Sequence, residues 1–139
     1  MVGSPPKARI EENADKIARH FASDDYEDIL ASLEADDSEW AAKELATLRG
    51  KSPQTCKVAL RQLATSLTLD DFADNMRMEY RIASRVITRP DFAEGVRARF
   101  KDRDQDPHWC YRSVAEVPDE EIEALFVPPW QQHPLTALG

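Results

Sequence analysis

Three aspartates at alternate positions, Asp102, Asp104 and Asp106, are the first residues whose type and spacing could do chemistry. Carboxylates spaced in this way open the 12-residue loop that binds Ca²⁺ in EF-hands, which continues with glycine at position 6 and ends with glutamate at position 12. Here those two positions hold Pro107 and Ser113. The spacing therefore favours a solvated loop of capping and paired charges, and we expect no metal site in the chain.

A cysteine activated by a histidine is the second possible site, with Cys56 and His108 as the candidates. Cys56, however, lies on an apolar helical stripe, where a buried cysteine behaves as a small hydrophobic residue. The histidines show no two-ligand helical spacing, and the sequence contains no nucleophile elbow, P-loop or dinucleotide-binding fingerprint. We therefore predict no catalytic residue in this chain. The residues do not identify a cofactor-binding site either.

Four basic residues could bind an anion such as a nucleotide phosphate, namely Lys57, Arg61, Arg77 and Arg81. More often such residues form a solvated helix face with neighbouring acids, and we favour this interpretation. The net charge of −8 disfavours nucleic acid as a partner. No apolar run approaches the length of a membrane span, and the two cysteines form no Cys-x-x-Cys pair. We expect a cytoplasmic protein with no membrane partner.

The elements that must position these residues are predicted to be helices throughout. Apolar residues recur at three- and four-residue steps, and no convincing strand alternation occurs. Gly50 is a typical helix end, and Ser52-Pro53 is a typical helix start. The expected helices cover residues 10–21, 26–33, 39–49, 53–67, 68–87, 91–100 and 118–126. The predicted fold class is all-α, as a small multi-helix domain or subdomain.

Two of these helices carry unusual patterns. The helix at 68–87 has one apolar stripe that includes Phe72 and Met76, and a second that includes Met78 and Ile82. A helix that is apolar on two faces is expected to lie between two partners. The helix at 91–100 is expected to turn its phenylalanines inward and contains Gly95.

We expect a flexible segment or linker at 1–8, one helical region at 9–127 and a loose tail at 128–139.

The stretch "RPDFAEGVRARFKDRDQDPHW" resembles a signature of the 3-hydroxyisobutyryl-CoA hydrolase branch of the crotonase (enoyl-CoA hydratase/isomerase) superfamily. Residues 91–98 match its helix of the type Asp-Phe-x-Glu-Gly-Val-Arg-Ala. Residues 102–109 match its Asp-Lys-Asp-x-x-Pro-x-Trp loop, with arginine in place of lysine. Three upstream stretches resemble the family in the same order: "LEADDSEWA" (33–41), "KSPQTCKVALRQL" (51–63) and "MEYRIASRV" (78–86).

The resemblance implies an enzyme of valine catabolism that hydrolyses a CoA thioester, with no cofactor apart from the CoA of its substrate. It also implies that an oxyanion hole and acidic side chains lie in a β-rich amino-terminal core with glycine-rich turns. With four glycines and no strand pattern, the chain resembles only the carboxy-terminal helical part. We therefore expect the chain alone to be inactive, and the missing core to be its partner.

Two alternatives stay open. The chain could be a helical interaction or scaffold module derived from this family, which exposed apolar surface and concentration-dependent self-association would favour. It could also be the tail of an enoyl-CoA hydratase or isomerase, because specificity resides in the site and not in the fold.

Overall fold

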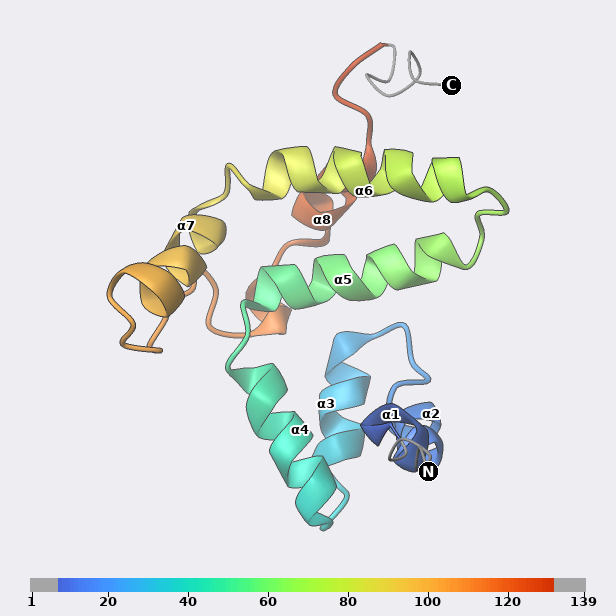
Figure 1. Cartoon of the computed structure of the whole chain (residues 1–139), viewed down its shortest axis with the longest axis vertical. Helices are drawn as coiled ribbons and strands as arrows, with labels where there is room; N and C mark the ends of the chain where they lie inside the picture. The colour runs from blue at the N-terminus through green and yellow to red at the C-terminus, as the bar shows by residue number, and fades with distance from the viewer. Residues whose placement is uncertain (1–7, 132–139) are drawn as a thin grey trace, which may run out of the picture. The chain divides into compact units, whose positions relative to one another are not determined.

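The computed structural model describes residues 8–131, and in this range it contains helices and turns but no strand (Figure 1). The predicted all-α fold class is confirmed. The chain divides into two compact units, Met1–Thr47 and Leu48–Gly139. Most of the predicted linker at 1–8 and most of the predicted tail at 128–139 lie outside the described residues. No helix among the described residues is long and apolar enough to cross a membrane.

The first unit contains α1 (Arg9–Glu12), α2 (Ala14–His20), α3 (Tyr26–Glu34) and most of α4 (Glu39–Arg49). Its buried apolar side chains are Ile29, Leu33 and Ala41. The continuous helix predicted for 10–21 is wrong, because Asn13 interrupts it with φ −111° and ψ 15°. The Asn13 side chain donates to the carbonyl of Arg9 at 2.9 Å, a local bond that competes with helix continuation.

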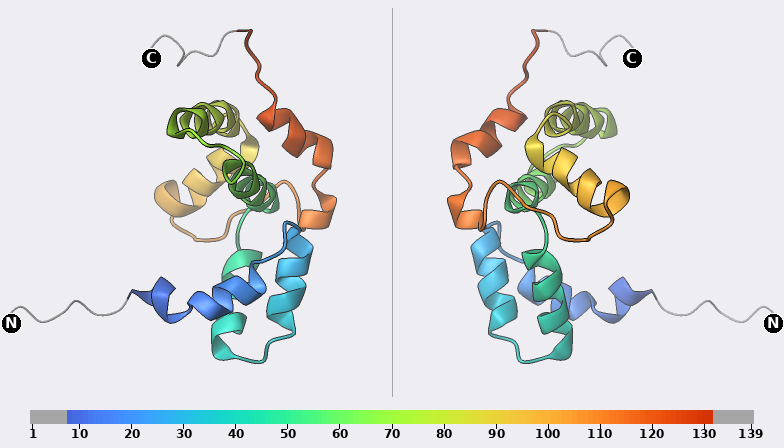
Figure 2. Two further views of the ribbon diagram at one scale, coloured as in Figure 1. Left: turned by 90° about the vertical axis from the view of Figure 1, so that its right-hand side faces the viewer. Right: turned by 90° about the vertical axis from the view of Figure 1, so that its left-hand side faces the viewer.

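The second unit contains the antiparallel pair α5 (Pro53–Ser66) and α6 (Phe72–Val86), followed by α7 (Pro90–Val96). A π-helical turn η1 (Arg97–Lys101), a 3₁₀ turn η2 (Val114–Glu116) and α8 (Asp119–Phe126) complete it. Helix α8 packs on one side of the α5–α6 pair, while α7 lies on the other (Figure 2). The core between these elements consists of Val58, Met78, Ile82, Val117, Ile122 and Leu125.

The start of α5 is confirmed, and the start of α6 is corrected. Ser52 caps α5 by accepting from the Thr55 amide at 3.2 Å, and Pro53 occupies the first helical turn. Helix α6 begins at Phe72 rather than at residue 68, because Asp71 is extended and its carboxylate accepts from the Ala73 amide at 2.9 Å. Residues 67–71 therefore turn the chain between the two helices.

The described residues supply one of the two partners expected for α6, and the burial predicted for the phenylalanines of α7 is wrong within this chain. Only the Met78–Ile82 side of α6 is covered, while Phe72 on the other stripe is 75% exposed. In α7 and η1 the phenylalanines point outward, with Phe92 46% and Phe100 70% exposed. The buried side of this segment carries Asp91 instead, because its carboxylate is hydrogen bonded to other parts of the unit.

Candidate functional site

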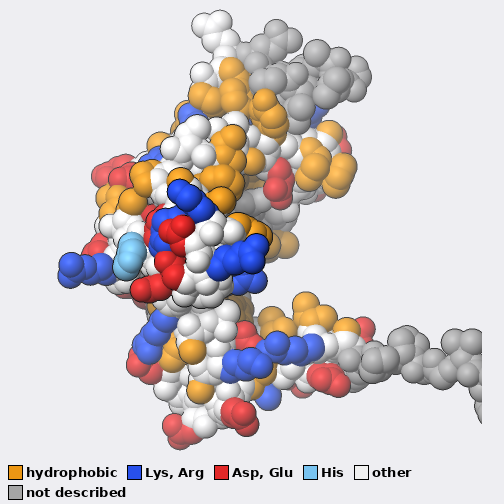
Figure 3. Space-filling view, turned by 60° about the vertical axis from the view of Figure 1, so that its left-hand side comes forward, with side chains coloured by type: hydrophobic (Ala, Val, Ile, Leu, Met, Phe, Trp, Pro, Cys, Tyr) orange, Lys and Arg blue, Asp and Glu red, His pale blue; other side chains and the backbone are white. Residues whose placement is uncertain are grey.

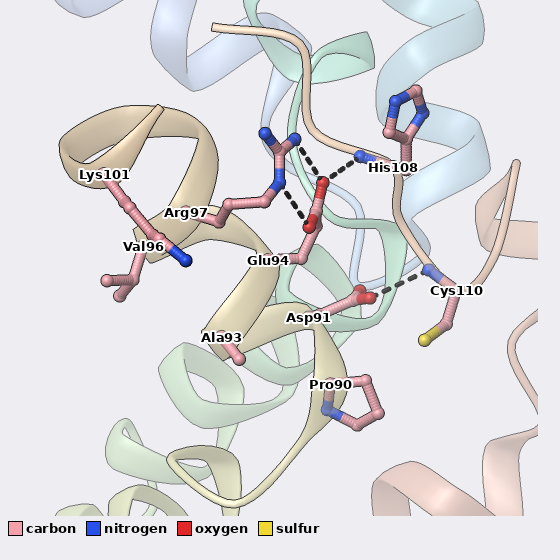
Figure 4. A pocket seen from close by; sticks show the side chains of 9 residues that line it. All are labelled: Pro90, Asp91, Ala93, Glu94, Val96, Arg97, Lys101, His108 and Cys110. Atoms are coloured by element: carbon pink, nitrogen blue, oxygen red, sulfur yellow. Dashed lines mark hydrogen bonds and ion pairs between the residues drawn. The ribbon is translucent and has the colours of Figure 1, made fainter. Parts of the chain in front are cut away.

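A pocket of about 580 Å³ lies where α7 and η1 meet the loop that follows them (Figure 4). It is the place where the residues of the recognised signature come together. The residues that line it are Pro90, Asp91, Ala93, Glu94, Val96, Arg97, Lys101, His108 and Cys110. Two carboxylates, a thiol and an imidazole thus share one concave surface, which makes it the candidate site of the second unit.

Glu94 is held by two partners on one side of this pocket. Its carboxylate accepts from Arg97 Nη2 at 2.7 Å and from Arg97 Nε at 2.9 Å, and also from the His108 amide at 2.7 Å. The bidentate Arg97 bond and then the His108 amide lower the pKa of Glu94 to about 2. The carboxylate is therefore ionised at neutral pH, and it has no proton to donate there.

Arg97 also fastens the aspartate loop. Its Nη1 donates to Asp102 at 2.9 Å and to Asp104 at 2.5 Å, while Nη2 donates to the Asp106 carbonyl at 3.1 Å. The bond from Arg97 holds the pKa of Asp104 below its usual value. The three alternating aspartates are thus organised around a guanidinium. Among the described residues no group of three or more metal-ligating side chains could hold a metal ion.

Asp91 joins three separate segments of the unit. Its carboxylate accepts from Ser52 Oγ at 2.5 Å, just before α5, and from the Cys110 amide at 2.8 Å, in the returning loop. The residue is only 5% exposed. The neighbouring Asp91 carboxylate raises the pKa of the Cys110 thiol, which keeps the thiol protonated at neutral pH and lowers its nucleophilicity.

Trp109 completes the attachment of the loop. A Cβ placed on Gly95 would lie 3.4 Å from the Cη2 atom of Trp109, so the indole packs on the bare backbone of α7. The indole Nε1 donates to the Gly50 carbonyl at 3.2 Å. Between these anchors, Arg103 and Gln105 have φ of 57° and 58°, a left-handed conformation that costs roughly 1–2 kcal/mol per residue.

The arrangement is a structural clasp. We call Asp91, Glu94, Arg97 and Trp109 the loop clasp, since together they fix the loop at 102–110 to α7 and to the start of α5. Both carboxylates that line the pocket accept charge-assisted or buried hydrogen bonds. His108 lines the pocket with Cys110, whereas Cys56 lies on α5 and does not line it. The Cys56–His108 pair is not assembled at this pocket.

The sequence reasoning missed the roles of Asp91 and of the Glu94–Arg97 pair. The pair had a readable signal, because a glutamate three residues before an arginine on a helix forms an ion pair. No local signal in the sequence indicated the role of Asp91, because its two partners lie 39 and 19 residues away.

Three of the four basic residues flagged as an anion site pair with acids, as the favoured interpretation predicted, whereas Arg81 binds a backbone carbonyl and its Nε is buried without a hydrogen-bond partner among the described residues. Lys57 binds Asp119 and Arg77 binds Asp74, at 2.6 and 2.7 Å. Arg61 lies 3.2 Å from Glu123, and Arg81 donates to a backbone carbonyl of α8 at 2.8 Å. These cations serve mainly to attach α8 to α5 and α6.

A second polar cluster lies in the first unit, where His20 is 3% exposed. Its Nδ1 lies 2.8 Å from Ser32 Oγ and its Nε2 lies 3.0 Å from Asp36 Oδ2. The Ser38 backbone and side-chain hydrogen bonds are the main causes that lower the pKa of Asp36 to about 2. The Ser32 hydroxyl, the His20 imidazole and the Asp36 carboxylate thus form one chain of hydrogen bonds. The imidazole is buried, however, and is not among the side chains that line the neighbouring groove. The cluster ties α2 to α3.

The loop clasp leads to a pH-dependence prediction. Because the folded pKa of Glu94 is lowered from 4.5 to about 2, its stabilising effect is complete above pH 4.5 and is lost as the pH falls toward 2. The indole N–H signal of Trp109 in NMR spectra, recorded from pH 6 to 2.5, should report release of the loop. The Glu94→Gln variant lacks the titrating group, so the stability difference between wild type and variant should shrink over this window. A constant difference would contradict the role of Glu94.

Comparison with known proteins places these features in a family. The enoyl-CoA hydratase/isomerase family matches residues 2–126, and the chain belongs to this family. The 3-hydroxyisobutyryl-CoA hydrolase of Gallus gallus is 35% identical over 119 residues, which are 86% of this chain and 31% of that protein. The Homo sapiens 3-hydroxyisobutyryl-CoA hydrolase is 36% identical over 84% of this chain and 30% of that protein. The resemblance read from the signature is confirmed.

Solved structures show the same helical arrangement. An enoyl-CoA hydratase from Rhodobacter sphaeroides 2.4.1 matches with a TM-score of 0.82 and 32% identity, over 93% of this chain and 38% of that one. A carnitinyl-CoA dehydratase from Mycobacterium thermoresistibile matches with a TM-score of 0.84 and 28% identity, over 95% of this chain and 38% of that one. The chain thus spans less than half of each solved chain, and about a third of the curated relatives.

Proposed function

We propose that this chain is the carboxy-terminal helical part of an acyl-CoA thioester hydrolase that acts on 3-hydroxyisobutyryl-CoA in valine catabolism. The observation that carries the proposal is the 33–37% identity to 3-hydroxyisobutyryl-CoA hydrolases over 84–90% of the chain. Because the chain spans only 30–32% of those proteins, we assign the thioester chemistry to a part of the enzyme that this chain does not span.

The chemistry of the described residues supports this division. The pocket of the second unit offers an ionised Glu94, a hydrogen-bonded Asp91 and a protonated Cys110 thiol. A hydrolase needs a base or nucleophile that can exchange a proton near neutral pH, together with donors for the developing oxyanion. We therefore expect the chain by itself to release no CoA, and we assign it a structural role in the intact enzyme.

Three proteins test this proposal: the chain alone, the Homo sapiens relative with its matched segment deleted, and the same relative with this chain grafted in its place. Each is incubated with 3-hydroxyisobutyryl-CoA, and free CoA is measured by mass spectrometry. We expect release only from the graft. Release of CoA by the chain alone would contradict the assignment of the thioester chemistry to a part of the enzyme that this chain does not span. A folded graft without activity would contradict the assignment to a hydrolase.

A second candidate is the tail of an enoyl-CoA hydratase, which the match to the Rhodobacter sphaeroides hydratase favours. Grafting the chain into that enzyme and measuring hydration of an enoyl-CoA separates the two. Restored hydration there, with no CoA release from the hydrolase graft, would favour the hydratase.

The cytoplasmic location stays a prediction, and the curated relatives carry mitochondrial names.

A further inference from the structure

A pocket of about 260 Å³ in the second unit is lined by residues of α5, α6 and α8 and of the turn between α5 and α6. We call it the arginine pocket, and its lining residues are Arg61, Thr65, Leu69, Asp74, Arg77, Met78, Arg81 and Phe126. Three guanidinium groups thus share one small concavity with one carboxylate of the described residues. They belong to three of the four basic residues that the sequence marks as possible anion ligands.

Arg81 is the arginine of this pocket whose hydrogen bonds are incomplete. Its Nη1 donates to the Phe126 carbonyl at 2.8 Å, whereas its Nε is buried and has no acceptor among the residues that the structure describes. A buried donor without an acceptor costs free energy, so native proteins usually provide one from the chain, from water or from a bound ion. The Nε and Nη2 donors of a guanidinium form one edge that matches two oxygens of an oxyanion. An oxyanion on this edge would supply the acceptor that Nε lacks.

The acids near the three arginines leave a surplus of positive charge. Arg77 binds Asp74 at 2.7 Å, and Arg61 lies 3.2 Å from Glu123, which does not line the pocket. Both ion pairs are partly exposed, and exposed pairs contribute little to stability, so an anion with two charges can compete with them. The lining itself carries three positive charges and one negative charge, a surplus of two, which Glu123 reduces to one.

The loop clasp has no such surplus among the described residues. Its Arg97 donates to the carboxylates of Glu94, Asp102 and Asp104, and acidic and basic side chains lie intermixed over this part of the unit (Figure 3). Arg97 therefore has charged acceptors within the chain, whereas the printed acceptor of Arg81 is one neutral carbonyl. This difference favours the arginine pocket over the loop clasp as an anion site.

We propose that the arginine pocket binds a phosphate dianion, either as inorganic phosphate or as the phosphoryl group of a small ester. Arg77 and Arg81 lie four residues apart on α6, so their side chains leave the same side of the helix. Arg61 reaches the pocket from α5. A small rotation of the half-buried Arg81 side chain brings its Nε–Nη2 edge to the anion. The two charges of the ligand match the surplus of the lining, whereas a carboxylate carries only one.

The uncharged part of the lining favours an ester over free phosphate. Leu69, Met78 and Phe126 contribute apolar side chains to the pocket. Burial of an apolar organic group against them adds to the attraction between the charges. Because three helices line the pocket, the bound ligand holds α8 to α5 and α6 and stabilises the second unit.

An NMR titration of the isotope-labelled 139-residue chain tests this proposal through the arginine Nε–H signals. Arg81→Lys keeps the charge and lacks one of these signals, which assigns the signal of Arg81. Inorganic phosphate, phenyl phosphate and benzoate are added at constant ionic strength and about pH 7.5, where phosphate esters are mostly dianions. We expect both phosphates to shift the Arg81 signal. Benzoate has the same ring with one charge and should bind about five-fold more weakly than phenyl phosphate.

Three variants, measured by calorimetric titration with phenyl phosphate, assign the binding to this pocket. Arg81→Met should weaken binding about ten-fold, because a hydrogen bond to a charged group is lost. The matched control is Arg85→Met, since Arg85 also lies on α6 and donates to a backbone carbonyl of α8, that of Ala124, but does not line the pocket. It should change the affinity less than about two-fold. Asp74→Asn removes the competing carboxylate and should strengthen binding about three-fold, a gain that a misfolded variant cannot produce.

Each result supports or overturns the proposal. It is wrong if neither phosphate shifts the Arg81 signal, or if Arg81→Met and Arg85→Met weaken binding equally, which would indicate general attraction by positive charge. Benzoate bound as tightly as phenyl phosphate would contradict a site for dianions, as would weaker binding by a folded Asp74→Asn variant. Equal affinities for the two phosphates would identify free phosphate as the ligand, and tighter binding of phenyl phosphate would identify an ester.

Discussion

Replacing Asp91 with alanine is expected to lower the free energy of unfolding of the second unit by about 3 kcal/mol. The carboxylate is 5% exposed and accepts from Ser52 Oγ and from the Cys110 amide, so its removal leaves two donors without their partner. A hydrogen bond to a charged group contributes about 1.5–3 kcal/mol, and native domains are stable by only about 5–15 kcal/mol. Thermal unfolding followed by circular dichroism should show a Tm lowered on the order of 10–20 °C.

The matched control is Asp102→Ala, which removes a carboxylate of the same loop. Asp102 is exposed and shares Arg97 with Asp104, so its ion pair is expected to contribute less than about 1 kcal/mol. If both variants unfold at the same temperature, the buried Asp91 does not stabilise the unit in the way its contacts indicate.

Local signals in the sequence were sufficient to predict the helices of the second unit and the break before α5, but not the start of α6. Gly50 and Ser52-Pro53 separate α4 from α5 as expected, because capping and proline preferences act within a few residues. The same locality explains the misplaced start of α6, where Asp71 is a stronger cap than Thr68. Asn13 interrupts the first helix by a bond to its own turn, which apolar periodicity does not register.

The orientation of α7 could not be predicted from periodicity, because it depends on distant polar partners. An apolar stripe predicts which side chains avoid water, but not whether the chain in hand contains the surface that covers them. The buried side is decided by bonds from Asp91 to residues 39 and 19 positions away. The family resemblance, in contrast, could be recognised from the sequence, because the spacing of Gly95, Pro107 and Trp109 is a local signature. The loop clasp explains part of this signature physically, since the Trp109 indole packs on Gly95.

A glycine in α7 could provide backbone freedom or space for the Trp109 indole, and substitutions of Gly95 distinguish these two roles. No glycine among the described residues has a positive φ, so backbone freedom does not require one here. A Cβ would meet Trp109 at 3.4 and 3.6 Å, which is ordinary contact. Gly95→Ala should therefore fold at least as stably as the wild type, because alanine is favoured in helices by about 1 kcal/mol.

Gly95→Leu should instead displace the Trp109 indole, breaking its 3.2 Å bond to the Gly50 carbonyl, and lower the free energy of unfolding by about 2 kcal/mol. The indole N–H signal of Trp109 should move toward its solvent-exposed position in the leucine variant and stay in place in the alanine variant. Denaturant unfolding of both variants measures the energies. If leucine is tolerated as well as alanine, the indole does not need the bare backbone of α7, and the glycine has no packing role. If alanine already displaces the indole, the available space is smaller than one methyl group.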